Sequence, residues 1–481
     1  MAAEVMSTIE EYSVCGRKAH GATRQLAEKA AGLSFDQLPD AVVTRARFAF
    51  LDAFACGAAG TVIAGNTLRE LRDWAAEYST PSKFRGAQLY DGSGSHPPSI
   101  AAFVNGAMGH TIDFDDTHMA SITHLGASLT ATTLALAQSR GASGAAVLTA
   151  MVAGYEVAGR VGRAALPGHY MRWHSTSSIG AMACAAAAGN LLGLDAEGID
   201  IAISYAADDA GGTQYGPKVG DFTKSMHAGV AAQKGIQAAT LAQASLVGPT
   251  GLLEHPRGFF WAYTDEGNAG RLDAVLAADD PEWESLEIDF KAYPAILTSH
   301  TFIEAITRLV VEHNLTADDI NAIDIWHPLF STNHGLNYAP ETELAARLSL
   351  PLCAAAAAVK RGFTLDTFAN NGFREPVINA LAQRVSCHVD DSYNTRYPNV
   401  TASRVVVETT KGATHELEII YPLGSHHRPM GQEQHIAKIR SLLRYAYDDQ
   451  RADSLIERGL RLERVRDFGD WFKDDGQPDR G

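Results

Sequence analysis

The chain has 481 residues, of which 46% are hydrophobic and 20% charged, and its formal net charge is −16. These values are typical of a globular protein of two or three compact units and exclude a disordered chain. The acidic balance argues against nucleic acid and anionic membrane surfaces as partners, so an acidic ligand would have to be bound by locally clustered cations.

The five cysteines are scattered and never form a Cys-x-x-Cys pair. This pattern disfavours a disulfide framework, a zinc ribbon and a cysteine-ligated iron–sulfur cluster, and it indicates a reducing, cytoplasmic location. The first 19 residues include three glutamates and no apolar core. We therefore predict no secretory signal, and the absence of an uninterrupted apolar stretch of about 18 residues predicts no membrane span.

From Ala22 to about Pro281 the sequence predicts helices, because alanine is dense and apolar residues recur every three or four positions. One of these helices is expected from near Ala145 to Val161, and Ala181–Gly189 suits the middle of an all-α core. The same texture returns from Gln432 to Leu460. The charged tail after Val465 is predicted to fray.

Between these helical parts, near Ser285, the texture changes to a mixture of strands and helices. Predicted strands are Leu286–Phe290 and Ile320–Pro328, predicted helices are Thr301–His313 and one or two segments in Thr342–Arg361, and a hairpin is predicted for Ser403–Glu408 and Thr414–Tyr421. We therefore predict a mostly α protein with an α+β part. A large all-α helical domain is built from both chain ends, residues 1–285 and 424–481, and a smaller α+β lid domain spans residues 286–423.

The densest polar cluster is Asp113–His118, followed by His124, between two apolar helices. Ionisable side chains are costly to bury there unless they are paired or used in chemistry. In one continuous helix Asp113 and His124 would lie roughly 16 Å apart, at about 1.5 Å per residue, so the chain must break between them if both serve one small substrate. For Asp115 and Asp116 the favoured interpretation is that they cap a helix and pair with arginines. For Asp113 and His124 the favoured interpretation is a part in the reaction.

An aspartate-rich motif on helices also allows a magnesium–diphosphate site, which needs carboxylates one turn apart and a second cluster of Asn, Ser or Glu. No second cluster is present, so this interpretation ranks low. Phosphate-binding loops, dinucleotide fingerprints, HExxH, EF-hand loops and GxSxG are absent as well. We predict no cofactor and no metal.

Three further polar segments precede helices or follow a predicted strand. His174 precedes an alanine-rich helix and suits anion binding or proton transfer as well as simple capping. Lys224 precedes another helix of small residues and could neutralise a carboxylate, although most lysines are solvated. Lys291 follows the first predicted strand, where loops often carry function, but Pro294 would also simply end a strand beside an exposed lysine.

Together these segments resemble the MmgE/PrpD family over roughly residues 25 to 450. The family is indicated by the motif Asp113–Thr117 with His124, followed by the lysine and histidine segments in this order. This pattern is specific for the family, but it is only weak evidence for any one member. The segments that carry the resemblance are Asp52 in Ala49–Asp52, Asp113–Thr117 with His124, Gly154–Val157, His174 with Thr176 and Gly180, Leu191–Asp195, Lys224 with His227 and Gly229, Lys291 with Tyr293 and Pro294, and Ala346–Arg347 with Ser349.

The resemblance implies a cofactor-independent lyase or isomerase that acts on a small di- or tricarboxylate. The family includes 2-methylcitrate dehydratase, cis-aconitate decarboxylase and iminodisuccinate epimerase. It also implies a homodimer with a metal-free pocket between the helical domain and the lid. By this resemblance the pocket is lined by Asp113, Thr117, His124, His174, Lys224 and Lys291, and Thr117, Tyr293 and Arg347 are assigned to substrate binding.

The chain departs from the family's pattern in three places. Leu125–Gly126 follows His124, where the family commonly has a Pro-Ser pair. Cis-aconitate decarboxylases carry a histidine at the position of Ile296 and a tyrosine in the region of Phe330–Thr332. The loss of an imidazole and a phenol predicts a substrate that is smaller or less polar on that side, and it disfavours cis-aconitate.

The mechanistic hypothesis is acid–base catalysis beside a carboxylate. His124 is the predicted principal acid/base, oriented or polarised by Asp113, and His174 is the second proton carrier. Lys224 and Lys291 are predicted to clamp carboxylates at about 3 kcal/mol per well-placed donor, with Lys291 brought in by closure of the lid. Two alternatives stay open: epimerisation at a carbon α to a carboxylate, and a non-catalytic metabolite-binding protein.

Overall fold

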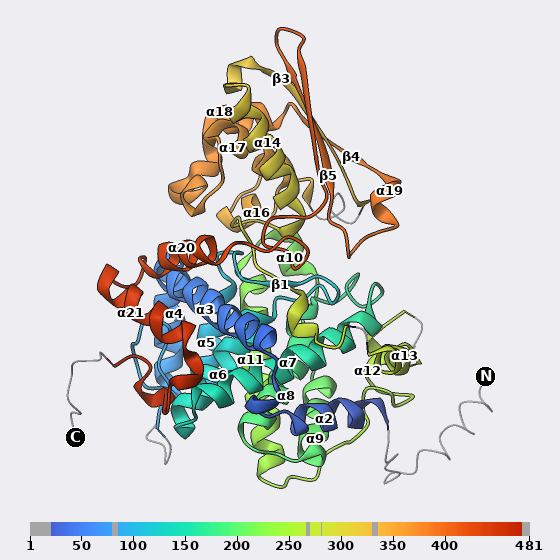
Figure 1. Ribbon diagram of the computed structural model, residues 1–481, viewed down its shortest axis with the longest axis vertical. Helices are drawn as coiled ribbons and strands as arrows, with labels where there is room; N and C mark the ends of the chain where they lie inside the picture. Colours follow the sequence, from blue (N-terminus) through green and yellow to red (C-terminus); the bar gives the residue numbers. More distant parts are fainter. Residues whose placement is uncertain (1–20, 79–84, 266–269, 280, 330–334, 474–481) are drawn as a thin grey trace.

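The computed structural model describes residues 21–78, 85–265, 270–279, 281–329 and 335–473. A large helical body carries a smaller α+β unit at one end of its long axis (Figure 1), so the predicted fold class is confirmed. The predictions for residues 1–19 and for Phe330–Thr332 lie outside the described residues.

The body is formed mainly by helices that lie between Ala22 and Ala278, and most of the long ones are buried. They are α2 (Ala22–Gly32), α3 (Asp40–Ile63), α4 (Asn66–Glu77), α5 (Pro98–His110), α6 (Leu125–Arg140), α7 (Gly144–Ala165), α8 (Ser175–Leu191), α9 (Ala196–Asp208), α10 (Tyr215–Val219), α11 (Phe222–Gln243), α12 (Phe259–Tyr263) and α13 (Gly270–Ala278). Helix α8 packs against α6, α7, α9 and α11. Small residues allow this close approach: a Cβ on Gly235 of α11 would lie 2.2 Å from the Cβ of Cys184 on α8.

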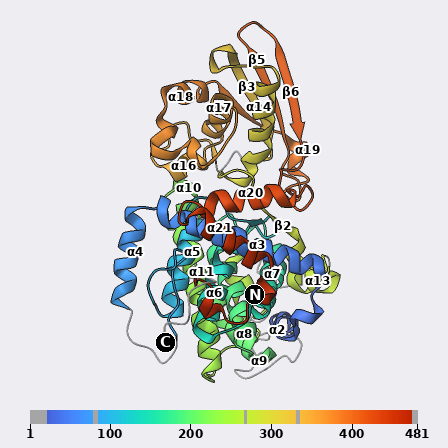
Figure 2. The ribbon, with the colours of Figure 1, turned by 60° about the vertical axis from the view of Figure 1, so that its left-hand side comes forward.

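The C-terminal helices α20 (Gln432–Leu443) and α21 (Asp449–Leu460) return to the body and pack against α3 (Figure 2). The tail beyond them is not frayed as far as it is described. Trp471 is fully buried and lies edge-on to Phe50 and Phe54 of α3, with ring centroids 5.2 and 5.5 Å apart. The prediction of a frayed tail was wrong because these aromatic contacts come from residues far apart in sequence.

Helix α3 is long and apolar enough to cross a membrane by length and composition alone. However, 78% of its most apolar window is buried inside the fold. The helix is covered by α5, α6, α20 and α21, which is the environment of a core helix in a globular protein.

The smaller unit contains a four-stranded sheet with the order β4-β3-β5-β6. Its strands are β3 (Ile320–His327), β4 (Val385–Val389), β5 (Ser403–Thr409) and β6 (Thr414–Ile419), and its longer helices are α14 (His300–Glu312), α16 (Glu343–Arg347), α17 (Leu350–Lys360) and α18 (Pro376–Ala382). Strands β5 and β6 form the predicted hairpin, and α14 and β3 are confirmed as well. Strand β4 was missed although its five residues alternate in polarity, because so short a segment is a weak signal by itself.

The strand predicted at Leu286–Phe290 is shorter than expected and belongs to the body. Strand β2 (Ile288–Asp289) follows a 3-10 turn and pairs antiparallel with β1 (Thr117–His118). Ile288 is fully buried in the core of the body, where Arg45 donates a hydrogen bond of 3.1 Å to its carbonyl oxygen. The core of the smaller unit runs from Ala295 to Ile419. The division of the chain at residues 286 and 424 remains a prediction.

Candidate active site

A cavity lies between the body and the smaller unit and collects the charged and imidazole side chains singled out in the sequence. Its walls are formed by Asp113, Thr117, Met119, Ile122, His124, Tyr170, His174, Pro217 and Lys224 of the body, and by Lys291, Ile296, Leu297, Thr298, Leu348 and Tyr397. All six residues predicted to line a pocket are therefore in one place. Their roles remain predictions.

The segment between α5 and α6 gives the cavity its floor. After α5 ends at His110, the chain turns through Asp113, whose φ of 52° lies in the left-handed region that non-glycine residues rarely adopt. Strand β1 and a tight turn closed by the bridge between His118 and Thr123 follow, and His124 is the N-cap of α6. The predicted break between Asp113 and His124 is confirmed.

Strand pairing places Lys291 beside the motif. Thr117 of β1 lies opposite Asp289 of β2, and Lys291 comes two residues later. Its ammonium nitrogen lies 3.0 Å from both the carbonyl oxygen and Oδ1 of Asp113, and the side chain is fully buried. Lys291 is thus held by the body, so the predicted closure of a lid is not needed to bring it to the site.

Asp113 is the meeting point of the two lysines. Its Oδ1 also accepts a hydrogen bond of 3.0 Å from Lys224, which lies in the first turn of α11. Burial by itself would raise the pKa of Asp113, but the ammonium groups of Lys224 and Lys291 outweigh it and hold the pKa well below its ordinary value. The buried Oδ2 of Asp113 has no hydrogen-bond partner among the described residues. Such an orphaned acceptor at a cavity wall is suited to a ligand.

As far as the structure describes the chain, each of the two lysine ammonium groups has one N–H donor left for a ligand. Lys224 donates to Asp113 and to Nε2 of His110, and Lys291 donates to the side chain and main chain of Asp113. A lysine has three donors, so each can offer one more to a ligand, counting the contacts in the described part of the chain. Burial is the largest influence on Lys224 and lowers its pKa, although Asp113 opposes that effect.

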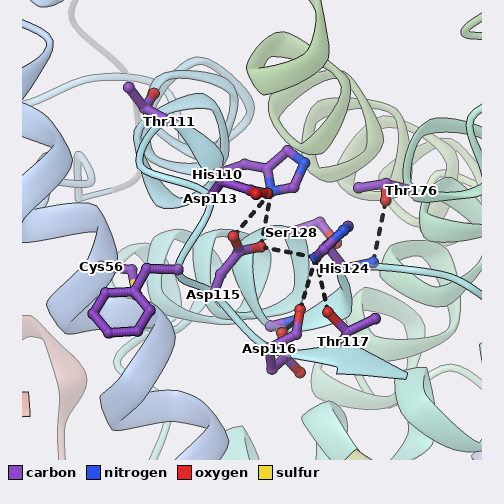
Figure 3. Close-up of polar contacts among 12 residues, drawn as sticks. Cys56, His110, Thr111, Asp113, Asp115, Asp116, Thr117, His124, Ser128 and Thr176 are labelled. Carbon is purple, nitrogen blue, oxygen red and sulfur yellow. Dashed lines mark hydrogen bonds and ion pairs between the residues drawn. The ribbon is translucent and has the colours of Figure 1, made fainter. Parts of the chain in front are cut away.

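His110 is a member of the site that sequence reasoning missed. Its Nδ1 lies 3.0 and 2.9 Å from the two carboxylate oxygens of Asp115 (Figure 3). Its Nε2 lies 2.7 Å from the ammonium nitrogen of Lys224. Nδ1 therefore carries the proton, and Nε2 accepts from the ammonium group. The available signal was a histidine at the end of an apolar helix, three residues before Asp113. The predicted pairing of Asp115 with an arginine is replaced by pairing with a histidine.

His124 is a neutral imidazole whose Nε2 can act as a base. Its Nδ1 lies 2.9 Å from the carbonyl oxygen of Asp116, which can only accept, and 3.3 Å from Oγ1 of Thr117 (Figure 3). The proton is therefore on Nδ1, and Nε2 has a lone pair. Burial and then the charge of Lys291 lower the pKa of His124 well below its ordinary value. Asp116 and Thr117, rather than Asp113, provide the hydrogen bonds that orient His124. The other predicted role of Asp113, polarising His124, remains a prediction.

Asp116 stabilises the same turn through hydrogen bonds to both of its carboxylate oxygens. Its Oδ1 accepts a hydrogen bond of 2.7 Å from the amide of Gly126 at the start of α6, and its Oδ2 accepts one of 2.6 Å from the Tyr155 hydroxyl. Helix capping was the favoured interpretation for this residue, but no arginine is involved. Burial raises the pKa of Asp116 to about 7, and the charge of Asp115 adds to this effect.

His174 lies on the cavity wall as the N-cap of α8. Its Nδ1 is 2.8 Å from Nδ1 of His227, so one ring donates and the other accepts. Burial and then His227 lower the pKa of His174 well below its ordinary value, and burial lowers that of His227 to about 4. The helix start is tied to the motif, because Oγ1 of Thr176 accepts a hydrogen bond of 3.1 Å from the amide of His124.

Two residues predicted to bind substrate are not on the cavity wall. The buried guanidinium of Arg347 donates to the carbonyl oxygens of Pro294 and Leu365, at 3.0 and 3.3 Å, and forms an ion pair with Glu343. The ring of Tyr293 packs edge-on against His300, with centroids 5.3 Å apart. Both placements correct the prediction: Arg347 holds the loop that follows Lys291, and Tyr293 packs beside it.

The rest of the wall was foreseen only in part. Ile296 lines the cavity, as the departure from the family's pattern suggested. Tyr170 and Tyr397 also line it and were missed, because no local pattern marks either tyrosine. Burial raises the pKa of Tyr170 to about 12, so this phenol stays protonated at neutral pH. The wall thus contains hydroxyl groups although Ile296 is apolar.

Two groups of described side chains have the composition of a metal site: His110, Asp115 and His124 beside the cavity, and His118, Glu284 and Glu287 away from it. His110, Asp115 and His124 offer ligand atoms within 4.8 Å of one another, a donor set that suits divalent transition metals. A cation there would have to displace the Nδ1 protons directed at Asp115 and at the carbonyl of Asp116, and it would face the ammonium group on Nε2 of His110. The residues therefore fit a cation poorly, and a metal-free reaction remains a prediction.

The chain is similar to known proteins over nearly its whole length. Residues 24–271 match the MmgE/PrpD N-terminal domain, and residues 293–462 match the MmgE/PrpD C-terminal domain. A cis-aconitate decarboxylase of Aspergillus terreus is 26% identical over 473 residues, covering 93% of this chain and 94% of that protein. The human cis-aconitate decarboxylase is 29% identical over 457 residues, covering 92% of each, and the mouse enzyme is 28% identical over 456 residues.

Proposed function

The chain belongs to the MmgE/PrpD family and is an enzyme of the lyase class, and from this premise we propose that it removes water or carbon dioxide from a small polycarboxylate without a cofactor. The observation that carries the proposal is the meeting of two ammonium groups and an unprotonated imidazole nitrogen at one buried cavity. The names of the relatives support decarboxylation or dehydration. Cis-aconitate itself is a finer assignment that the apolar Ile296 disfavours.

The lysines would bind the substrate and stabilise the transition state. The remaining donors of Lys224 and Lys291 take a substrate carboxylate, and they also oppose the negative charge that develops on the adjacent carbon and its carboxylate oxygens. A preorganised donor of this kind contributes about 3 kcal/mol to the lowering of the barrier. Asp113 stays ionised, and its Oδ1 holds both lysine side chains in place.

His124 would move the proton. In a dehydration its Nε2 takes the proton from the carbon beside the carboxylate, the carbon–oxygen bond breaks, and the hydroxyl leaves as water with a proton from a second group. In a decarboxylation the carbon–carbon bond breaks, carbon dioxide leaves, and the electron pair remains on the substrate carbon, which then takes a proton that Nε2 of His124 has first accepted from the solvent. His174 is the candidate for the second group because it lines the same cavity. Such transfers contribute roughly 10²–10⁴-fold.

Epimerisation is the second candidate, since it also needs two acid/base groups and His124 and His174 supply them. The reactions differ in their products. Elimination leaves a carbon–carbon double bond. Epimerisation in heavy water gives the stereoisomer that is inverted at one carbon and carries deuterium there, so NMR of the product separates the two reactions.

The test is turnover of a panel of small hydroxy- and unsaturated polycarboxylates, followed by NMR. For the acid that reacts, His124→Gln is expected to lower kcat at least about 100-fold. His415→Gln, in the sheet of the smaller unit, is the matched control and should leave kcat unchanged. Near wild-type turnover by His124→Gln would remove this assignment. Because the pKa of His124 is lowered, kcat/KM should fall on the acid side only well below pH 6.5.

Assembly as a homodimer in the cytoplasm is proposed from the family resemblance. Multi-angle light scattering should then give a mass near twice the 51.4 kDa of the chain.

A further inference from the structure

The charged side chains of the cavity wall all meet at one point. Among the described residues that line the cavity, the charged ones are Asp113, Lys224 and Lys291, and both lysines lie 3.0 Å from the same oxygen of Asp113. The two ammonium groups are therefore neighbours. Burial keeps His124 and His174 neutral by lowering the pKa of each. The cavity thus has one cationic end and no second one within the described part of the chain.

The remaining wall is uncharged, and much of it is apolar. Ile296, Leu297 and Leu348 face the cavity from the smaller unit. The amide of Ile296 donates a hydrogen bond of 3.1 Å to the carbonyl oxygen of Arg347, so Ile296 lies beside Leu348 and they form one apolar surface. Met119 and Ile122 extend the apolar lining from the body.

The nearest arginine along the chain cannot serve this surface. Arg347 precedes Leu348, but its guanidinium is buried against Pro294, Leu365 and Glu343. A carboxylate placed against Ile296 and Leu348 would therefore lose its water and gain no cation from the described cavity wall in return. Burying an unpaired charge in this way is strongly unfavourable, whereas a branched alkyl group is stabilised there by leaving water.

We infer that the substrate carries its carboxylates at one end only, on Lys224 and Lys291, and turns an uncharged alkyl branch toward Ile296 and Leu348. The inference rests on the proposed function and narrows its substrate class from tricarboxylates to short branched acids with one charged end. The hydroxyl groups of Tyr170, Tyr397 and Thr298 on the same walls allow a hydroxyl or carbonyl group between the two ends.

Two unreactive acids of equal skeleton test this directly. Propane-1,2,3-tricarboxylate and 2-isobutylsuccinate differ in that an isopropyl group replaces one terminal carboxylate. Isothermal titration calorimetry of the full-length protein should show 2-isobutylsuccinate binding at least about tenfold more tightly. Equal binding, tighter binding of the tricarboxylate, or binding of neither acid at millimolar concentration would overturn the inference.

A charge placed on the apolar wall should reverse the preference. Ile296 is only partly buried, so Ile296→Lys adds a cation there without filling a closed core. The ratio of the two dissociation constants should shift at least about tenfold toward the tricarboxylate. Leu417→Lys is the matched control: Leu417 is partly buried in the same unit but does not line the cavity, and this variant should keep the wild-type ratio. An unchanged ratio in folded Ile296→Lys would contradict the inference.

The two proposals fail in different ways. Turnover of a tricarboxylate, together with preferred binding of propane-1,2,3-tricarboxylate, would leave the lyase proposal standing and remove the narrowed substrate class. Preferred binding of 2-isobutylsuccinate, without turnover of any acid, would support the binding geometry and remove the lyase reaction.

Discussion

Two of the buried aspartates among the described residues, Asp52 and Asp113, each meet a lysine and a second basic side chain, and of these two only Asp113 lies at the cavity. Asp52 of α3 accepts hydrogen bonds from Nε2 of His435 at 2.8 Å and from Lys438, which lies 2.8 and 3.0 Å from its two oxygens. Asp113 accepts from Lys224 and Lys291 at 3.0 Å. We call these groups the Asp52 cluster (Asp52, His435 and Lys438) and the Asp113 cluster (Asp113, Lys224 and Lys291).

The clusters differ in what they leave unsatisfied. Both oxygens of Asp52 are used. The ring of His435 is stacked on Phe48 and tilted against Phe290, with centroids 4.7 and 4.4 Å away. The Oδ2 of Asp113 has no partner among the described residues, and its backbone is in the left-handed region. Burial of a charged group by itself therefore does not indicate function. Function is indicated by an acceptor and donors at a cavity that have no partner in the protein.

The Asp52 cluster also stabilises the backbone of the turn that contains Asp113. Lys438 donates to the carbonyl oxygen of Phe114 at 2.9 Å, and Lys291 donates to that of Asp113 at 3.0 Å. Two lysines, from distant parts of the chain, thus hold two consecutive carbonyl groups of the turn. Hydrogen bonds to the backbone on both sides stabilise a conformation that Asp113 would rarely adopt alone.

The largest expected effect is on stability, in the Asp52 cluster. Lys438→Met leaves a buried carboxylate with one partner, and we expect the free energy of unfolding to fall by about 3–5 kcal/mol. Lys360→Met breaks an exposed ion pair with Glu375 and should cost less than about 1 kcal/mol. Denaturant unfolding measures both. A loss for Lys438→Met no greater than the control's would show that this cluster is not structural.

The next effect is on catalysis, in the Asp113 cluster. Lys224→Met removes one donor to the substrate and should lower kcat/KM about 100- to 1,000-fold. Lys234→Met, on the same helix and paired with Asp209 at the surface, is the matched control and should remain fully active. Unaltered steady-state kinetics of a folded Lys224→Met protein would place substrate binding elsewhere.

A smaller effect concerns the pH dependence of stability at the turn. The pKa of Asp116 in the folded protein is raised from its ordinary value to about 7, so the folded state binds this proton more tightly than the unfolded state. Its contribution to stability is present at acid pH and is lost as the pH rises toward 7. Relative to Asp116→Asn, wild-type stability should fall by about 1–2 kcal/mol from pH 5 to 7. A parallel pH dependence of the two proteins in thermal unfolding would contradict this ionisation.

The smallest effect is expected at Thr117. Its hydroxyl lies 3.3 Å from Nδ1 of His124, but the carbonyl of Asp116 is closer and remains when the hydroxyl is removed. Thr117→Val should therefore lower kcat by no more than about tenfold, the value of an ordinary hydrogen bond. A loss as large as that of His124→Gln would instead give Thr117 a direct part in the reaction.

The sequence was informative where function depends on local pattern. Lys224 and Lys291 stood out because each begins or follows an element next to small or apolar residues, and the helix break after Asp113 followed from geometry. His110 and the partners of His124 depend on the exact turn, which no spacing rule predicts. Arg347 was misassigned because its position near the loop does not reveal that its guanidinium turns toward backbone carbonyl groups. The pairing of strand β2 with β1 was not foreseen because the two strands lie far apart in sequence.

The central claim is that Lys224 and Lys291 together bind a carboxylate beside the unprotonated nitrogen of His124. A crystal structure of the complex with 2-isobutylsuccinate tests it most directly. We predict carboxylate oxygens at about 2.7–3.2 Å from both ammonium nitrogens and the chain of the ligand facing Nε2 of His124. A carboxylate bound away from both lysines would contradict the account.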